Sequence, residues 1–486
     1  MPINSFLYPG PTNSNPYVVD NSCRFNDDDS ACLNRSNGSS PSSQRIFTFS
    51  AWVKRGNLGS NNQTFMCIQD TGDGDPRVRC AFRDDDKLYF DVSASDGSGD
   101  FDVRTTRVFR DVGAWYHFVF RIDTTQSTAA DRVKMYVNGS QITSFSTATY
   151  GSQNYDLPTN LDEINIGTVD NNSRTNFFDG YLAEVVYCDG QSLAPSSFGE
   201  FDEDSPTVWK PKDVSGLTFG TNGFYLDFED SSNLGNDKNG GTDLTEVNLA
   251  AADQATDTPT NNFATLNPLW VGYDNDGTYS EGNCKRSFTS ANSDRGYGIS
   301  TMGVTAGKWY WEIKVPTVAR ASTGVGDANA MSAFSGPFYD EGSSKSMGLN
   351  TNGNIEENTD STSYANSLSD NDIVMYALDM DNHRCWYGIN GTWQDSGDPT
   401  SGSTGTGDMT TQISDQTHIN TGEFIFPFCF DASTTGQSDF EWNFGGCPAF
   451  SISSGNADGN GYGNFEYAPP SGFLALCSKN LGSDGG

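Results

Sequence analysis

Histidine is scarce in this chain: its 486 residues include only His117, His383 and His418. The recurring patterns that mark catalytic sites are also missing, since HExxH, GxSxG and phosphate-binding glycine loops do not occur. No apolar run approaches the length of about 18 residues that a membrane-spanning helix needs. We therefore expect no catalytic residues, no required cofactor and no membrane insertion.

Basic residues are few as well. Lysine and arginine number 28 against 63 aspartates and glutamates, which gives a net charge of −35. Such a field repels phosphate backbones, so we do not expect nucleic acid as a partner. The ten cysteines form no CxxC pair, and residues 1–6 lack the basic and apolar regions of a secretory signal. We therefore expect no secretion and mostly reduced thiols.

Alternating aromatic runs are what the chain has in abundance. Within residues 307–315, one face carries Trp309, Trp311, Ile313 and Val315. This period of two is typical of a β-strand that packs one face against a core. Comparable strand-like runs lie at residues 47–53, 115–122, 132–137, 180–187, 373–381 and 424–430. The pattern predicts an all-β protein.

Composition divides the chain into five segments. Residues 1–44 and 229–262 are polar and rich in Asn and Asp, and are expected to be an N-terminal arm and a linker. Residues 45–228 and 263–480 each hold a full set of strand-like runs. Two antiparallel β-sandwich domains in tandem are therefore expected, followed by a short tail at residues 481–486.

The strand-like runs of the first sandwich occur in a recognisable order along the chain. They read FTFSAWVKR, WYHFVFRID, VKMYVNG, INIG and FDGYLAEVVYCDG. In this order they resemble a laminin-G-like, concanavalin A-type jelly roll. The resemblance implies two sheets packed face to face, with ligand binding at the rim loops.

The second sandwich shows a comparable pattern between about residues 270 and 450. Its runs read GKWYWEIKV, VGD, YALDMD, RCWYGINGTW, FIFPFCF and WNFGG. In this order they resemble a SPRY (B30.2) domain, which implies a two-sheet sandwich that binds a partner through variable loops, without catalysis. A long polar insertion at residues 397–422 departs from the family pattern.

In tandem, the two domains resemble virion structural proteins of tailed phages, notably marine ones. This resemblance implies a fibre, spike or head-decoration protein that is made in the host cytoplasm, located in the virion and docked on the particle by its N-terminal arm. The expected partners are other virion proteins, within an oligomeric assembly, and a host-surface glycan. Two alternatives stay open: a structural decoration protein that binds no receptor, and a glycan-degrading depolymerase.

A depolymerase on a jelly roll would need paired carboxylates on one strand, in the pattern Glu-x-Asp-x-x-Glu, so that acid and nucleophile lie close together. Glu200 and Asp202 supply the first half of this pattern, but Ser205 stands where the second glutamate is needed. The sequence therefore favours binding over hydrolysis.

Polar loops beside the predicted strands supply the candidate sites. Amides, carboxylates and aromatic rings suit a shallow glycan site. The candidate glycan-binding residues are Asp170, Asn171, Asn172, Phe338, Tyr339 and Trp393. A glycine-bent loop at residues 70–75 gathers three carboxylates, which are the ligands that Ca²⁺ prefers. The candidate calcium ligands are Asp70, Asp73 and Asp75.

Overall fold

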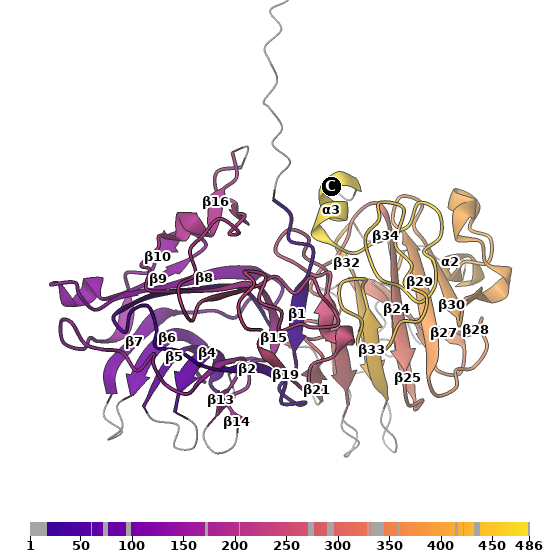
Figure 1. Ribbon diagram of the computed structural model, residues 1–486. Helices are drawn as coiled ribbons and strands as arrows, with labels where there is room; N and C mark the ends of the chain where they lie inside the picture. Colours follow the sequence, from indigo (N-terminus) through magenta and orange to yellow (C-terminus); the bar gives the residue numbers. More distant parts are fainter. Residues whose placement is uncertain are drawn as a thin grey trace, which may run out of the picture.

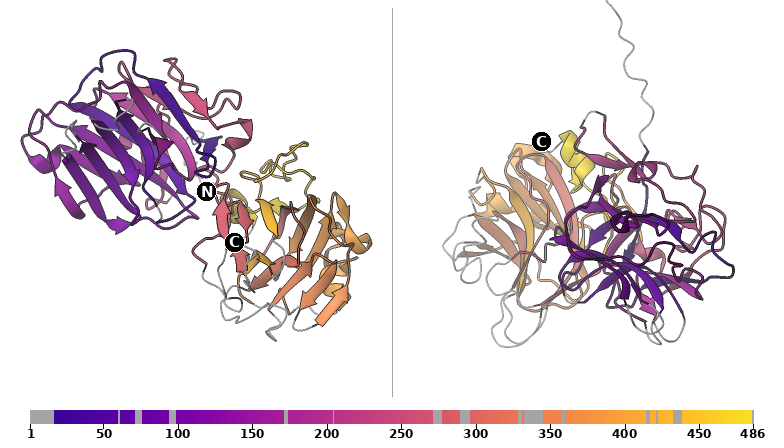
Figure 2. Two further views of the ribbon diagram at one scale, coloured as in Figure 1. Left: turned by 90° about the horizontal axis from the view of Figure 1, so that it is seen from below. Right: turned by 90° about the vertical axis from the view of Figure 1, so that its left-hand side faces the viewer.

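The computed structural model describes residues 17–59, 61–70, 76–93, 99–170, 174–203, 205–270, 277–288, 296–327, 331, 345–357, 360–413, 417–420, 422–431 and 438–484. These residues form two β-rich lobes that lie side by side (Figures 1 and 2). Both lobes are built from mainly antiparallel sheets, which confirms the all-β, two-sandwich prediction. Among the described residues, no helix is long and apolar enough to cross a membrane.

The first sheet of the N-terminal lobe has the order β10-β9-β8-β3-β15-β1-β20, with β18 also beside β15. Its strands are β1 (Ser22–Phe25), β3 (Ile46–Arg55), β8 (Trp115–Asp123), β9 (Val133–Val137), β10 (Ser140–Gln141), β15 (Gly180–Asp189), β18 (Phe224–Leu226) and β20 (Gln254–Ala255). The second sheet packs against it and has the order β11-β7-β6-β5-β4-β12-β2-β19. Its strands are β2 (Cys32–Ser36), β4 (Gln63–Gln69), β5 (Arg77–Phe82), β6 (Lys87–Ser93), β7 (Gly99–Val108), β11 (Phe145–Thr149), β12 (Glu163–Ile166) and β19 (Thr245–Val247).

Two small hairpins lie outside these sheets. One pairs β13 (Val169–Asp170) with β14 (Arg174–Thr175), and the other pairs β16 (Gly199–Phe201) with β17 (Trp209–Pro211). The β16 hairpin projects from the N-terminal lobe in Figure 1.

The C-terminal lobe repeats the two-sheet plan. One sheet has the order β21-β22-β33-β24-β29-β30-β31, with β34 parallel to β24. Its strands are β21 (Thr278–Ser280), β22 (Lys285–Ser287), β24 (Lys308–Val315), β29 (Asp372–Asp379), β30 (Arg384–Ile389), β31 (Thr392–Trp393), β33 (Asp439–Asn443) and β34 (Leu474–Ala475). The other sheet has the order β23-β32-β25-β26-β27-β28. Its strands are β23 (Gly296–Ile299), β25 (Ala321–Asp327), β26 (Ser346–Asn350), β27 (Asn354–Glu357), β28 (Asp360–Ser363) and β32 (Ile425–Asp431).

Helical segments are short. They are η1 (Ala129–Asp131), η2 (Pro195–Ser197), η3 (Ala251–Asp253), η4 (Gln394–Ser396), η5 (Pro399–Thr404), α2 (Met409–Ile413) and α3 (Ser478–Asp484). Helix α3 covers part of the segment that the sequence pattern assigns to a tail. All ten cysteines are buried, and none of them is joined to another by a disulfide bond.

Two Asn-Gly pairs form tight turns between strands. Asn138 and Gly139 connect β9 to β10 with φ angles of 46° and 74°. Asn390 and Gly391 connect β30 to β31 with φ angles of 48° and 82°. Positive φ at both positions is what a type I′ hairpin requires, and Asn and Gly tolerate it best. Both turns therefore have the backbone geometry that an Asn-Gly pair favours.

Strand β24 is buried on both faces. Trp309 and Trp311 are fully buried in the core between the two sheets, as the alternation predicts. On the opposite face, the ring of Tyr310 lies 5.0 Å from that of Phe465, within a second buried cluster that includes Trp386 and Phe473. The sequence pattern predicts only one buried face, because it does not show that a later segment returns to cover the other.

The expected arm and linker contribute strands to the N-terminal sandwich. Strand β1 pairs with β15 and β20, and β2 pairs with β12 and β19. These short pairings make both segments part of the sandwich, whereas the sequence predicts a separate arm and a linker. They escape a local pattern because each partner lies more than a hundred residues away along the chain.

Buried charges join the two lobes. Arg24 in β1 donates to Asp253 at 3.0 Å, contacts Glu281 at 2.9 Å and donates to the carbonyl of Pro448 at 3.0 Å. Lys54 in β3 contacts Asp257 at 2.6 Å. Since these partners come from both sandwiches and from the segment between them, the lobes meet through a charged and hydrogen-bonded joint.

Candidate functional site

Strand alternation places arginines on the outer face of the second sheet in the N-terminal lobe. In β5, Val78 and Cys80 point into the core between the sheets. Arg77 and Arg79 therefore point away from it, because successive side chains of a strand face opposite sides. The same rule brings Tyr89 of β6 to the outer face, where it lines a hollow with both arginines.

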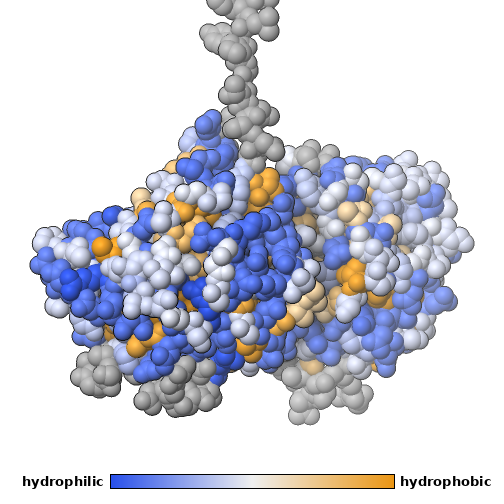
Figure 3. All heavy atoms as spheres, viewed as in Figure 1, coloured by the Kyte–Doolittle hydropathy of each residue, from blue (hydrophilic) through white to orange (hydrophobic). Residues whose placement is uncertain are grey.

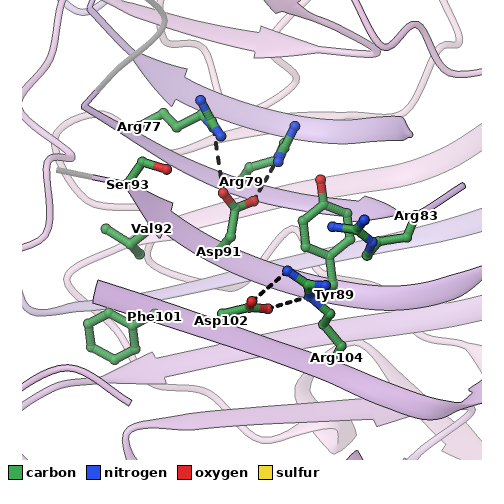
Figure 4. Close-up of a pocket in the computed structure, with 10 residues that line it drawn as sticks. All are labelled: Arg77, Arg79, Arg83, Tyr89, Asp91, Val92, Ser93, Phe101, Asp102 and Arg104. Carbon is green, nitrogen blue, oxygen red and sulfur yellow. Dashed lines mark hydrogen bonds and ion pairs between the residues drawn. The ribbon is translucent and has the colours of Figure 1, made fainter. Parts of the chain in front are cut away.

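Aspartates of the neighbouring strands complete the site. Arg79 lies opposite Asp91 of β6, which in turn lies opposite Asp102 of β7. Nε of Arg79 donates to Oδ1 of Asp91 at 2.7 Å, and Nε of Arg77 lies 3.5 Å from Oδ2 of the same carboxylate. Arg104 binds Asp102 with two parallel hydrogen bonds of 2.6 and 2.5 Å. Figure 4 shows these ion pairs side by side on the sheet.

Tyr89 lies beneath two of the arginines. The guanidinium carbons of Arg79 and Arg83 lie 4.9 and 5.6 Å from the centre of its ring. Burial raises the pKa of Tyr89, so its hydroxyl stays protonated. This hydroxyl is buried and has no hydrogen-bond partner among the described residues.

The hollow has a volume of about 230 Å³, which suits one or two sugar rings but no large apolar ligand. Its lining residues are Arg77, Arg79, Arg83, Tyr89, Asp91, Val92, Ser93, Phe101, Asp102 and Arg104. The face of the molecule drawn in Figure 3 is mainly hydrophilic, with hydrophobic residues scattered in small groups. The lining of the hollow is itself mostly charged and polar, so a polar ligand fits it better than an apolar one.

Only three of the nine residues chosen from the sequence, Asp70, Asp170 and Trp393, belong to the described part of the chain. Asn171, Asn172, Phe338, Tyr339, Asp73 and Asp75 lie outside the described residues. The backbone of Asp170 pairs with Arg174 in the β13 hairpin, and half-buried Asp70 follows β4. Trp393 lies in β31 of the other lobe, where it packs against the buried cluster around Trp386. Among the described residues, no group of three metal-ligating side chains is present.

Sequence reasoning missed the arginines of the hollow. The signal was the alternation Arg-Val-Arg at residues 77–79, Tyr-Phe-Asp at 89–91 and Asp-Val-Arg at 102–104. Each triplet alone is an ordinary strand with one polar face. Only the order β5-β6-β7 in the sheet shows that the three polar faces are adjacent.

Two other groups have the residue types of catalytic sites. Glu200 and Asp202 lie at the β16 hairpin, where both contact Lys210, and belong to neither large sheet. His117 receives a hydrogen bond on Nδ1 from Trp209 at 2.9 Å, and its Nε2 lies 2.8 Å from Oγ of Ser50. Burial lowers the pKa of His117 to about 3, so this ring is neutral and enclosed.

Comparison with known proteins agrees with the N-terminal fold. Residues 25–191 match the laminin-G family model described as the concanavalin A-like lectin/glucanases superfamily. No curated protein matches the chain. Solved structures include a Bacteroides ovatus protein described as carbohydrate binding, with 16% identity over 48% of this chain and 59% of that one and a TM-score of 0.30.

Two further solved structures are similar. A heptameric SAP-like pentraxin from Limulus polyphemus is 15% identical over 37% of this chain and 80% of its own, with a TM-score of 0.27. The SPRY domain of human HERC1 is 17% identical over 32% of this chain and 86% of its own, with a TM-score of 0.22. The family match confirms the predicted resemblance of the first domain: residues 25–191 form a concanavalin A-like jelly roll.

Proposed function

We propose that this chain is a non-enzymatic glycan-binding protein and that its jelly roll holds the saccharide on the outer face of β5, β6 and β7. The observation that carries the proposal is the polar hollow between these strands. Carboxylates there accept hydrogen bonds from sugar hydroxyls, whereas guanidinium groups donate to sugar oxygens. Such paired donors and acceptors, on rigid strands, orient a polar ligand.

The proposal includes a biological setting. The chain acts as an adhesion protein of a phage virion, as a fibre, spike or head-decoration component with other virion proteins as neighbours. The support for this setting is the tandem order of jelly-roll and SPRY-like motifs in the sequence. In that setting, the ligand of the hollow is a glycan of the host surface.

Binding of the full chain to a glycan array, followed by calorimetry on the saccharides retained, tests the proposal. The Asp102→Ala/Arg104→Ala double variant removes one half-exposed ion pair from the hollow. We expect it to weaken binding about tenfold, since charge-assisted hydrogen bonds are among the stronger contacts in a polar site.

The matched control removes a comparable ion pair elsewhere. Lys134 and Asp131 lie 3.1 Å apart beside the first sheet and outside the hollow. The Asp131→Ala/Lys134→Ala variant should bind like the wild type. A chain that retains no saccharide, or a hollow variant with unchanged affinity, would contradict the proposal.

A further inference from the structure

Four arginines gather at one hollow of an acidic protein. The chain carries 28 basic residues in all, against 63 acidic ones. Arg77, Arg79, Arg83 and Arg104 nevertheless line the hollow together with the carboxylates of Asp91 and Asp102, and Arg83 also lies 3.4 Å from Asp84. Among the described residues, arginines therefore outnumber carboxylates at this hollow, in a chain where acidic residues outnumber basic ones.

The ion pairs leave guanidinium donors unused. Arg79 donates to Asp91 through Nε, and Arg104 donates to Asp102 through Nε and Nη2. Within the described part of the chain, neither terminal nitrogen of Arg79 has an acceptor, and Nη1 of Arg104 has none. A terminal guanidinium nitrogen that has no acceptor can donate a charge-assisted hydrogen bond to an oxygen of a carboxylate or sulfate group.

The aromatic rings of the hollow are not open to a neutral sugar. Tyr89 is 1% exposed and carries the guanidinium groups of Arg79 and Arg83, whereas Phe101 is fully buried. Guanidinium groups therefore cover the ring face on which a neutral sugar would stack.

We infer that the saccharide held by this hollow is anionic, and that its carboxylate or sulfate group contacts the terminal nitrogens of Arg79 and Arg104. This inference rests on the proposed glycan-binding function and names the class of its ligand. Asp102 then has a second role, because it occupies the fork of Arg104 and competes with the anion for it.

Calorimetry of the full chain with three hexasaccharides tests the inference: a uronate oligomer, a sulfated oligomer and a neutral oligomer of the same length. The uronate and sulfated arms distinguish the two possible sources of the anionic group. We expect at least one of them to bind about tenfold more tightly than the neutral oligomer, as one charge-assisted pair would give.

Two single variants distinguish recognition of the ligand's charge from a general loss of folding. Arg104→Gln should weaken binding of the anionic oligomer about tenfold, whereas Asp102→Asn should strengthen it a few-fold because it releases the guanidinium fork. Arg121→Gln is the control, because Arg121 lies on β8 of the opposite sheet, where its Nε donates to Ser192. Its affinity should match that of the wild type, and the unfolding curves of all three variants report that the fold is kept.

The failures are distinguishable. Equal binding of neutral and anionic oligomers, together with weaker binding by Asp102→Asn, overturns the anionic ligand but leaves the proposed glycan site. If no saccharide of any class binds the wild type, the proposed function itself fails.

Discussion

The ammonium group of Lys54 lies 2.6 Å from Oδ2 of Asp257, and both side chains are 1% exposed. Oδ1 of the same carboxylate accepts a hydrogen bond from the indole of Trp115 at 2.9 Å. Lys54 also donates to the carbonyl of Phe263 at 2.9 Å, where the second sandwich begins. A single carboxylate in the connecting segment therefore holds a strand of one domain against the start of the next.

Removing this carboxylate should strongly destabilise the protein. Asp257→Ala leaves the ammonium of Lys54 buried without its counter-charge, and breaking one partner of a buried pair costs about 3–5 kcal/mol. Urea unfolding measures the change. Asp156→Ala, which removes an exposed partner of Arg45, should leave the midpoint nearly unchanged. Equal urea midpoints for Asp257→Ala and Asp156→Ala would show that the buried Lys54–Asp257 pair does not stabilise the protein.

Glu184 should make stability fall as the pH rises. Burial raises its pKa from 4.5 to about 7, although the hydroxyls of Tyr225 and Tyr17 donate to it and partly oppose the shift. Between these two values the folded state keeps a proton that the unfolded state has lost. The stabilisation is therefore complete below the unfolded pKa and disappears as the pH rises through the folded pKa.

A comparison of wild type with Glu184→Gln measures this effect. The variant keeps a neutral side chain at all pH values, so between pH 5 and 8 the wild type should lose about 3 kcal/mol relative to it. Unfolding curves at both pH values give the difference. Parallel pH profiles of the two proteins would show that Glu184 does not titrate in this range.

His117 should stay neutral and keep one tautomer down to low pH. Trp209 donates to Nδ1, so the ring proton must lie on Nε2, which then donates to Ser50. Because burial lowers the pKa of His117 to about 3, its contribution to stability is present above pH 6.5 and is lost as the pH falls toward 3. Nitrogen-15 NMR should show a protonated Nε2 and constant shifts between pH 8 and 4. A titration midpoint of the His117 shifts near pH 6 would show that the ring is not enclosed in this way.

Glu312 should hold the C-terminal segment on β24. Its carboxylate is fully buried and accepts from Tyr310, Asn443 and the backbone N–H groups of Glu466 and Tyr467. Glu312→Ala leaves these donors without an acceptor, so we expect a loss of more than about 3 kcal/mol.

Limited proteolysis gives the specific readout for Glu312→Ala. Cleavage should appear first within residues 451–473, before the rest of the domain is cut. The control is Glu229→Ala, whose half-exposed carboxylate contacts Lys238. It should give the wild-type fragment pattern. If Glu312→Ala is cut no faster than this control, the carboxylate does not anchor the segment.

Local patterns predicted those parts of the fold that depend on neighbouring residues. The alternation around Trp309 and Trp311 identifies a core strand, and Asn138 with Gly139 identifies a hairpin, because both signals are complete within a few residues. Strand β1 has a weaker signal, because only the short run Cys23-Arg24-Phe25 is strand-like and its pairing partners lie far along the chain. Its four residues include Arg24, whose partners Asp253 and Glu281 lie more than two hundred residues away.

The candidate site shows the same limit. Polar loops drew attention to Asp170 and Trp393, which lie in different lobes. The hollow instead combines Arg79, Asp91 and Arg104 from three strands, and their proximity depends on strand order and register. Residue composition indicates which side chains suit a ligand, but only the paired sheet brings them to one place.

The position of β1 also sets an order of events during synthesis. This strand lies between β15 and β20, so its second neighbour is not available until residues 254–255 have been made. At about 5–20 residues per second, roughly ten to fifty seconds separate the synthesis of Ser22 from that of Ala255. The beginning of the chain must therefore stay unpaired on that side while the rest of the jelly roll is produced, and the N-terminal domain is completed only as the second domain starts to emerge.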